Sequence, residues 1–373
     1  MQAILACEKQ EQRDPYRQIL INCGVDCGAD DAVTYAQLSA RINRGGAELL
    51  VAVLGKNPVE ALRLVDQIHQ KSPLPILMMG PGDDAQLILQ AMKAGARDYV
   101  DVAQPRESLT KSLEKLRKTG AIRFQRGQSI VVTGAIPGSG VTTVASGLAF
   151  ALGAKYPKQV VLAELGVPVP ELALDLDLQP RYSVSQMLQD WNRADASTVR
   201  QAALEHARGV YILADAVSGR GVAAAEEADA CRQMLLLLRT LYNHAVYDIG
   251  HAAQTELAQQ AIRLADRVVM VVRLDVPGVR MARAMLNRLT DIGVQPAQLT
   301  LVANRYGQRK QIGWRKAEEA LGATVAVWLP EDPGTVNQAL NYGIPLTEAS
   351  GWSKFGRRLH ELAKLMVPAP AKK

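Results

Sequence analysis

Short apolar runs alternate with segments of helical spacing along the first 118 residues. The apolar runs at 2–7, 49–54, 75–79 and 98–102 predict strands, and the stretches 32–43, 59–70, 84–94 and 105–117 predict helices. In segment 59–70, for example, Leu62, Val65 and either Ile68 or His69 share one helical face. Alternating elements of this size form a parallel sheet with helices on both faces, so we expect a doubly wound α/β domain here.

The same alternation resumes at residue 129 and continues to residue 366. Strands are predicted at 129–133, 159–164, 210–214, 244–248, 267–273, 299–304 and 323–328, with helical stretches between most of them. This pattern predicts a second doubly wound, parallel-sheet α/β domain. The stretch 117–128 is polar and basic, so we assign 1–118 to the first domain, 119–128 to a linker and 129–366 to the second domain. We expect the Pro-, Ala- and Lys-containing end, 367–373, to be disordered.

Composition narrows the class of protein without naming a function. With 373 residues of which 48% are hydrophobic, the chain can build two buried cores. The formal net charge of +6 is mild and argues for no particular partner. No apolar run approaches the ~20 residues that cross a bilayer, and Glu8, Glu11 and Asp14 lie where a signal peptide would be apolar. The four cysteines lack zinc-site spacing. We therefore expect a cytoplasmic protein with reduced thiols.

The loop 134–143, GAIPGSGVTT, carries the strongest chemical signal. It lies between a predicted buried strand and a predicted helix, which is the context of a phosphate-binding loop. Gly138, Gly140, Thr142 and Thr143 suit a backbone that closes its N–H groups around a phosphate at a helix N-terminus. The position directly after the last glycine, where such a loop needs a lysine, holds Val141.

Segment 91–99, AMKAGARDY, resembles the end of a response-regulator receiver domain. The resemblance covers about residues 1–118 and implies a flavodoxin-like fold. A working receiver needs an aspartate at the end of the third strand, an acidic pair for Mg²⁺ and a lysine after the last strand. Here the third strand ends at Leu54 without a carboxylate, the lysine position falls at about Val102, and only Glu8 remains near the acidic pair. We therefore expect an atypical receiver-like domain without a phosphoacceptor, used for docking or dimerisation.

Four segments of the second domain resemble ParA/MinD proteins, namely the loop 134–143, AVYDIG at 245–250, LVANR at 301–305, and LPEDPGTVNQALNYGIP at 329–345. The resemblance implies a deviant P-loop fold that binds ATP or ADP with Mg²⁺. In such a site Thr142 and Asp248 hold the metal, the Asn304 amide reads adenine, and the 329–345 segment wraps the base. The implied nucleotide-binding residues are Gly138, Ser139, Gly140, Val141, Thr142, Thr143, Asn304, Arg305 and Pro330.

The loop departs from the family pattern K-G-G-x-G-K-T-T at the positions that matter for hydrolysis. Aligned on Gly140, both lysines are replaced, by Ile136 and Val141, and Pro137 replaces a glycine. The carboxylate that positions the attacking water falls at Gly166. Hydrolysis needs charge stabilisation on the moving phosphoryl group and an oriented water. We therefore expect no catalytic residue, no cation beside the outer phosphates, and nucleotide binding that is weak or absent.

A receiver-like domain followed by a ParA/MinD-like domain is the architecture of the TadZ/CpaE proteins of Flp (tight-adherence) pilus systems. Segment 159–188 also resembles that family. The resemblance implies a dimeric localisation factor at the inner face of the membrane at a cell pole. It would mark the assembly site of a Flp pilus and recruit the pilus secretion ATPase and inner-membrane assembly proteins. Two alternatives stay open, an active MinD-like ATPase that cycles on the membrane and a ParA-like DNA partition protein.

Two basic segments bear on these alternatives. Segment 352–366 places an apolar stripe beside lysines and arginines, so it could lie on an anionic membrane or pack on its own sheet, and we favour the sheet. The stripe comprises Trp352, Phe355, Leu359, Leu362 and Met366. Segment 305–316, RYGQRKQIGWRK, could contact DNA phosphates, but a solvated face or a protein partner is the favoured interpretation, so we do not expect nucleic acid as a partner.

Overall fold

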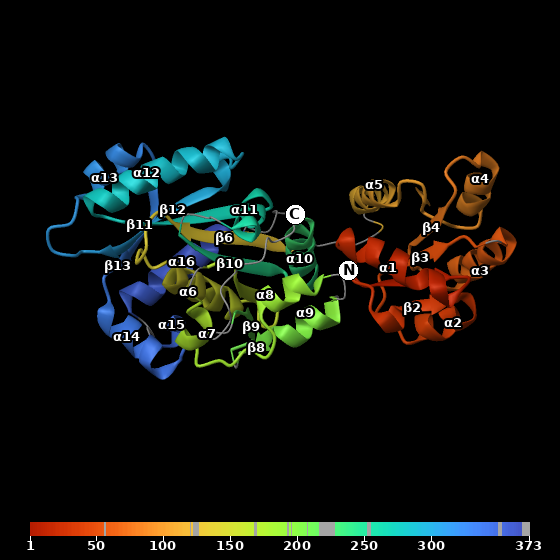
Figure 1. The fold of residues 1–373 in the computed structure, drawn as a ribbon, viewed down its shortest axis with the longest axis horizontal. Helices are drawn as coiled ribbons and strands as arrows, with labels where there is room; N and C mark the ends of the chain where they lie inside the picture. Colours follow the sequence, from red (N-terminus) through yellow and green to blue (C-terminus); the bar gives the residue numbers. More distant parts are fainter. Residues whose placement is uncertain are drawn as a thin grey trace. The chain divides into compact units, whose positions relative to one another are not determined.

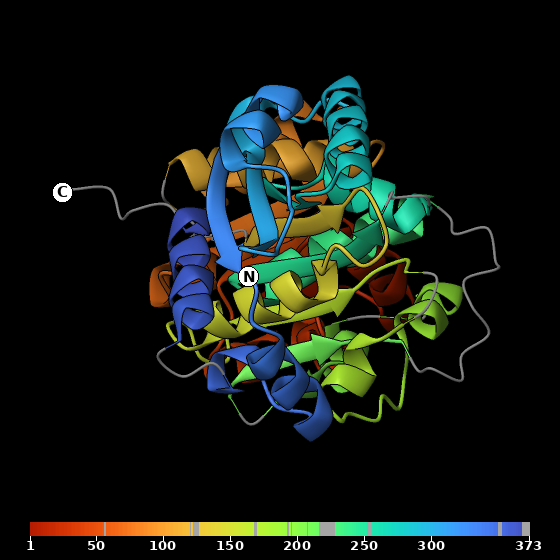
Figure 2. The same cartoon turned by 90° about the vertical axis from the view of Figure 1, so that its left-hand side faces the viewer.

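The computed structural model shows two compact units (Figures 1 and 2). It describes residues 1–55, 57–119, 121, 127–167, 170–191, 194, 196–206, 208–215, 228–251, 255–349 and 353–367. The first unit comprises Met1–Arg126 with Asp195–Ser197, and the second comprises Gly127–Ala194 and Thr198–Lys373. Within the expected 119–128 linker, Gln128 already opens a strand of the second unit. Residues 120, 122–126 and 368–373, which include most of the expected linker and tail, lie outside the described residues.

The first unit is a five-stranded parallel sheet with the order β2-β1-β3-β4-β5. Its strands are β1 (Ala3–Cys7), β2 (Ala32–Thr34), β3 (Leu49–Val53), β4 (Ile76–Gly80) and β5 (Asp98–Asp101). Its helices are α1 (Arg13–Asn22), α2 (Tyr35–Asn43), α3 (Pro58–Lys71), α4 (Ala85–Lys93) and α5 (Pro105–Lys118). One core contains Leu20 of α1 and Leu109 of α5, and the other contains Leu38 of α2 and Val65 of α3. Helices therefore cover both faces in the flavodoxin-like strand order.

Two features of the first unit differ from the pattern-based expectation. The helix expected at 32–43 begins at Tyr35, because Ala32–Thr34 form the edge strand β2 instead. The helix α1 was not expected, since only Leu20 and Ile21 of its ten residues are buried and its apolar stripe is therefore short.

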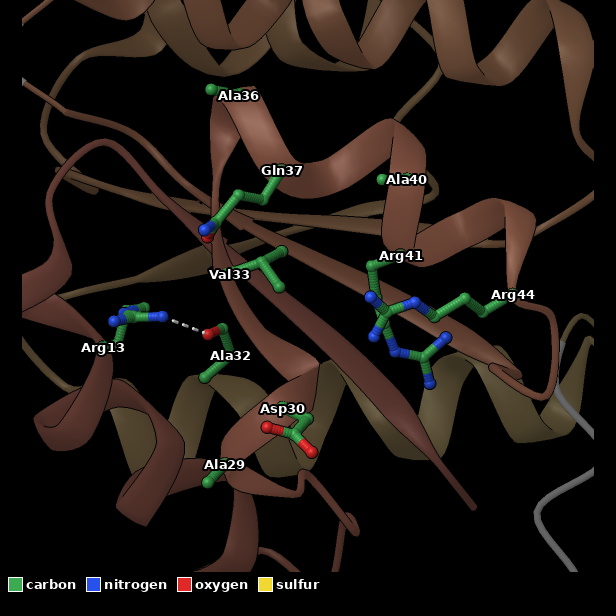
Figure 3. Close-up of a pocket in the computed structure, with 10 residues that line it drawn as sticks. All are labelled: Arg13, Ala29, Asp30, Ala32, Val33, Ala36, Gln37, Ala40, Arg41 and Arg44. Carbon is green, nitrogen blue, oxygen red and sulfur yellow. Dashed lines mark hydrogen bonds between the residues drawn. The ribbon is translucent and has the colours of Figure 1, made fainter.

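A hollow of about 400 Å³ lies at the β2 edge of this sheet (Figure 3). Three arginines line it together with short side chains of α2. Arg13 Nη1 donates to the Ala32 carbonyl over 2.7 Å, and Arg41 Nε donates to Asp31 Oδ1 over 2.6 Å. Arg44, at the C-cap of α2, is exposed and directs its guanidinium into the hollow (Figure 3). Asp30 also lines the hollow and Asp31 pairs with Arg41, so this edge presents a concave surface with a small excess of positive charge.

The second unit is an eight-stranded sheet with the order β13-β12-β11-β6-β10-β7-β9-β8. Its strands are β6 (Gln128–Gly134), β7 (Val160–Glu164), β8 (Leu204–Glu205), β9 (Val210–Leu213), β10 (His244–His251), β11 (Arg267–Arg273), β12 (Leu299–Tyr306) and β13 (Val325–Pro330). The helices before β10 are α6 (Val141–Gly153), α7 (Leu172–Asp175), α8 (Val184–Gln189), α9 (Ala196–Ala202) and α10 (Ala228–Leu241). Those after it are α11 (Glu256–Arg263), α12 (Val276–Asp291), α13 (Trp314–Leu321), α14 (Pro333–Tyr342), α15 (Leu346–Ala349) and α16 (Lys354–Met366).

Alternate residues of each central strand point to opposite helical layers. Val269 and Val271 of β11 pack in one core with α6 and α16. On the opposite face, the hydroxyl of the buried Tyr247 donates to the Leu235 carbonyl of α10. The views agree that α12 and α13 cover one face while α6, α14 and α16 cover the other (Figures 1 and 2). The second unit is therefore doubly wound, as its pattern predicts.

The expectation of an entirely parallel second sheet is wrong at one edge. Strand β8 pairs with β9 in antiparallel register, with Leu204 opposite Ile212 and Glu205 opposite Tyr211. Only residues 206–209 connect the two strands. A parallel crossover needs a dozen residues or more, so a link this short can only form a hairpin.

The C-terminal helix α16 belongs to the core of the second unit. Phe355, Leu359, Leu362 and Met366 are buried in the cluster that contains α6. Leu359 fills the space over Gly147, where an added Cβ would lie 2.6 Å from its Cδ1. The favoured packing interpretation thus holds for these four residues, while Trp352 lies outside the described residues. Among the helices that the structure describes, none is long and apolar enough to cross a membrane.

Candidate nucleotide site

The glycine-rich loop joins β6 to α6 at the carboxyl edge of the second sheet. Gly138 has a φ of 70°, and Gly140, the N-cap of α6, has a φ of 92°. Residues with a Cβ rarely adopt this left-handed region, so glycine is needed at both positions. A Cβ on Gly140 would also overlap the side-chain nitrogen of Asn304. The loop therefore has the strand–loop–helix geometry that its sequence predicts.

Asn304, at the end of β12, braces this loop from the neighbouring strands. Its Nδ2 donates to the Ser139 carbonyl over 2.9 Å, and its Oδ1 accepts from the Arg305 N–H over 2.9 Å. The side chain is buried, with 5% of the residue exposed. This amide is committed to the loop backbone in the structure. Its reading of adenine stays a prediction.

Asp248 and Thr142, the expected metal ligands, lie together beneath the loop. Asp248 is fully buried in β10, and its Oδ1 accepts from the Gly250 N–H over 3.0 Å. Burial raises the pKa of Asp248 to about 6, although the Gly250 N–H and the nearby Thr142 side chain lower it. At neutral pH most of this carboxylate is charged and available to a cation.

A second buried carboxyl, Glu164, ends the neighbouring strand β7. Its Oε1 accepts from the backbone N–H groups of Glu171 and Leu172, over 2.8 and 3.1 Å. Burial raises the pKa of Glu164 to about 8, and the charge of Asp248 adds to the increase. Glu164 is therefore mostly protonated at neutral pH and does not supply a second anion for a metal.

Position 166, which the family pattern gives to a water-positioning carboxylate, has no room for a side chain. Gly166 has a φ of 66°, and an added Cβ would overlap the Thr255 hydroxyl. Thr255 in turn caps α11, because its hydroxyl accepts from the Ala258 N–H over 3.2 Å. A carboxylate at this position would require the start of α11 to move.

Unpaired polar atoms concentrate around the loop. Five buried side-chain atoms have no hydrogen-bond partner in the described residues, and three of them are Ser139 Oγ, Asp248 Oδ2 and Glu164 Oε2. An unsatisfied buried polar group costs roughly 1–3 kcal/mol, so a native structure needs a reason for each one. A magnesium nucleotide provides such a reason for the hydroxyl and the Asp248 carboxylate. The residues present therefore fit a Mg²⁺–nucleotide at this loop.

Neither residue at the two lysine positions supplies charge, but an unexpected arginine does. Val141 is buried in the core cluster, and Ile136 is half-buried beside it in the loop. Arg273, the last residue of β11, has its Nη1 3.9 Å from the place where a Cβ on Gly138 would lie. An arginine therefore approaches the loop at Gly138, while our expectation that no cation lies beside the outer phosphates stays a prediction. The available signal was an arginine that follows the apolar run Val268–Val272 at the same sheet edge.

The remaining expected site residues follow the same edge of the sheet. Thr143 is half-buried in the first turn of α6, and Arg305 follows Asn304 as an exposed residue with a φ of 55°. Pro330 ends β13 and pairs with Tyr306 of β12. The carboxyl ends of parallel strands meet at one edge of a sheet, which explains why residues so distant in sequence gather here.

Proteins similar to this chain are found among solved structures but not by sequence comparison. No protein-family model matches the chain, and no curated protein matches it in sequence. A ParA family ATPase from Chlorobium tepidum is 16% identical with a TM-score of 0.57, over 64% of this chain and 98% of that one. MinD from Pyrococcus horikoshii, solved with Mg-ADP, is 19% identical with a TM-score of 0.52, over 64% and 95%. MinD in the MinC:MinD complex of Aquifex aeolicus is 20% identical with a TM-score of 0.54, over 66% and 99%.

These likenesses fix the fold of the larger part of the molecule. The C-terminal part of the chain has the ParA/MinD fold. Identities of 16–20% carry no more than the fold. In this ParA/MinD-like unit, the geometry of the loop, Asp248 and Arg273 therefore carries the evidence for a nucleotide site.

Proposed function

We propose that this protein is a non-catalytic localisation factor of the TadZ/CpaE type, which weakly binds ATP or ADP with Mg²⁺. The observation that carries the proposal is the contrast between a formed phosphate loop and a lysine position, Val141, that is packed in the core. The positive-φ glycines and the Thr142–Asp248 pair support binding. The missing carboxylate at Gly166 argues against rapid turnover.

Different residues of the chain would bind the phosphates, hold the metal and fix the loop conformation. Backbone N–H groups at the start of α6 would donate hydrogen bonds to the phosphate oxygens, where the helix dipole favours negative charge. Mg²⁺, when bound, neutralises charge between the phosphate oxygens. Thr142 and the Asp248 carboxylate would hold that ion from beneath the loop. Asn304 keeps the loop in its left-handed conformation through the Ser139 carbonyl.

The cellular role that we propose is to mark the assembly site of a Flp-type pilus. The nucleotide-bound ParA/MinD-like unit would dimerise, and the receiver-like unit would dock the pilus secretion ATPase and inner-membrane assembly proteins. Two features support docking by the first unit, its lack of a phosphoacceptor after β3 and the arginine-lined hollow at its sheet edge. Charge complementarity suits that hollow to an acidic segment of a partner.

Titration calorimetry with ATP and Mg²⁺ tests the binding half of the proposal. We expect a dissociation constant above about 1 µM, a binding free energy weaker than about 8 kcal/mol. Asp248→Asn keeps a side-chain oxygen to accept the Gly250 N–H but loses the charge, so binding should no longer depend on Mg²⁺ in this variant. Failure of the wild type to bind ATP at millimolar concentrations would exclude a nucleotide-binding role.

The position of the protein in the cell tests the proposed role at a pilus assembly site. A fluorescent fusion should form a polar focus in the cell of origin, and deletion should abolish pili while leaving the pilus secretion ATPase diffuse. Arg44→Glu reverses the charge of an exposed wall of the hollow and should release that ATPase from the focus without removing the focus itself. Normal piliation in the deletion strain would exclude the proposed role.

The position of Arg273 favours a second candidate function, slow ATP hydrolysis. A cation beside Gly138 can stabilise charge that develops on a departing phosphoryl group. A steady-state ATPase assay of the wild type and Asp248→Asn separates the two functions. Turnover that disappears in the variant would identify an ATPase, and its absence at saturating ATP would leave the localisation factor.

A further inference from the structure

We propose that Arg273 replaces the missing lysines of the loop by binding the outer phosphates of the nucleotide. Without nucleotide, Arg273 forms an ion pair with Asp275, which it leaves when the phosphates bind. This inference rests on the nucleotide site proposed above. It adds a ligand for the di- and triphosphate part of the nucleotide that no family pattern assigns to this position.

The strand register places Arg273 at the mouth of the loop. In β11, Val271 pairs with Gly134 of β6, where the loop begins, and Arg273 pairs with Asn304 of β12. Val269 and Val271 face the α6 side of the sheet, so the side chain of Arg273, two residues further, emerges on the same side. The Asn304 brace and the Arg273 guanidinium therefore approach the loop from adjacent strands.

The atoms nearest to each loop glycine show that Arg273 approaches the loop at Gly138. The atoms that a Cβ would meet at Gly134 belong to Ser139, Val141 and Val271, and those at Gly140 belong to Asn304 and Thr143. At Gly138 the neighbour is Arg273 Nη1, at 3.9 Å. In the described part of the chain, Arg273 Nη1 is the only atom of a cationic side chain among the three nearest atoms within 4 Å of each added Cβ at these glycines. A guanidinium presents several donors in a planar fork that matches a phosphate, so it suits this task.

The ion pair between Arg273 and Asp275 can break without movement of Asp275. Its Oδ2 lies 2.6 Å from Arg273 Nη2, with side-chain exposures of 37% and 35%. An ion pair this exposed contributes little net stability, so a phosphate that carries more charge can displace the carboxylate. Meanwhile Asp275 Oδ1 accepts from the Gly278 N–H over 2.7 Å and caps α12. The carboxylate is thus fixed by the helix, and the exchange requires only the arginine side chain to turn.

Nucleotides of different phosphate length provide the test. Titration calorimetry with Mg²⁺ compares ATP, ADP and AMP on the wild type, Arg273→Ala and Arg273→Lys. We expect Arg273→Ala to weaken ATP binding about 10- to 100-fold, in line with the strength of hydrogen bonds to charged groups. AMP should bind the variant and the wild type equally. Lysine should restore part of the affinity because it keeps the charge without the fork.

Two further variants separate the proposal from general electrostatics and from folding. Arg288→Ala removes an exposed arginine of α12 that belongs to no expected site and should leave all three affinities unchanged. Asp275→Ser keeps an N-cap for α12 while it removes the ion pair, so ATP should bind several-fold more tightly. Thermal unfolding should show the same midpoint for Arg273→Ala and wild type, because the lost pair is exposed.

The outcomes test the roles of Arg273 and Asp275 separately from the nucleotide site itself. If Arg273→Ala binds ATP as the wild type does, or loses AMP affinity to the same extent, Arg273 is not a phosphate ligand, although the nucleotide site stands. An unchanged or lower ATP affinity in Asp275→Ser would overturn the role of Asp275. A wild type that binds none of the three nucleotides overturns the nucleotide site itself and this inference with it.

Discussion

Two buried carboxyl groups beneath the phosphate loop differ in their charge at neutral pH. Glu164 ends β7, and Asp248 lies opposite it in the adjacent strand β10. Burial raises the pKa of each carboxyl, to about 8 for Glu164 and about 6 for Asp248. Because one group keeps its proton while the other loses it, the pair avoids two adjacent buried anions. A bound cation would lower the pKa of Asp248, because it favours the charged form of that carboxyl.

This arrangement predicts a stability that falls as the pH rises. The folded protein holds the Glu164 proton up to about pH 8, whereas the carboxyl has an ordinary pKa of 4.5 in the unfolded chain. Folding therefore takes up a proton between these values, and the free energy of unfolding decreases as the pH rises from about 5 to 8. Glu164→Gln should remove the part of this slope that Glu164 contributes and leave the smaller part that Asp248 contributes below about pH 6. The variant should exceed the wild type at pH 8 by on the order of 4 kcal/mol.

Urea unfolding followed by circular dichroism from pH 5 to 9 measures both effects. Glutamine keeps a side-chain oxygen for the Glu171 and Leu172 N–H groups, so the native contacts survive the change. The exposed Glu171→Gln serves as the matched control and should follow the wild-type curve. Curves for Glu164→Gln and the wild type that run parallel over this range would contradict the proton uptake.

The sequence identified some of these residues and missed others for a physical reason. Gly140 and the Thr142–Asp248 pair occupy positions in local motifs, whose spacing can be recognised before folding. Arg273 and the brace from Asn304 to Ser139 depend on how β11, β12 and β6 align. No local pattern specifies that register, so the sequence placed Asn304 near a base and did not place Arg273 at all.

At the scale of elements, α16 resolves a choice that the sequence left open. An amphipathic basic helix suits a membrane surface as well as a protein core, since both bury one apolar stripe. In the structure the stripe packs against α6, where Leu359 covers Gly147. By contrast, Leu365 lies on the outer side of the helix with 48% of its surface exposed.

Leu359→Ala should therefore destabilise the protein by about 2–5 kcal/mol, because it opens a cavity at a fully buried position. Leu365→Ala, on the same helix, should change the free energy of unfolding by less than about 0.5 kcal/mol. Urea denaturation of the full chain measures both values. Equal and small effects, together with loss of binding to anionic lipid vesicles in Leu359→Ala, would instead support the membrane interpretation.

The elements that pattern analysis missed are short or weakly amphipathic. Strand β2 has three residues and β8 has two, fewer than the four to eight over which an alternating pattern can be recognised. Helix α1 buries two of its ten residues. The longer buried strands were predicted to within a few residues, since runs such as 267–273 are apolar almost throughout. Length and apolar content thus decided which elements were visible in the sequence.

At the scale of the whole molecule, the two units have separate hydrophobic cores. The clusters of the first unit lie entirely within residues 3–116, and the cluster around α6 lies within residues 130–366. The proposed nucleotide ligands all belong to the second unit. A ligand that binds only there stabilises only the cooperative unit that contains it.

Scanning calorimetry of the full chain should consequently show two transitions, of which Mg-ATP raises one. At 100 times the dissociation constant the stabilisation should be about 2.7 kcal/mol. Asp248→Asn should lose the Mg²⁺-dependent part of that shift, and Arg44→Glu in the first unit should leave it unchanged. Because Leu359→Ala weakens only the core around α6, it should lower the nucleotide-sensitive transition alone. A single transition that Mg-ATP raises as a whole would instead mean that the two units unfold as one cooperative body.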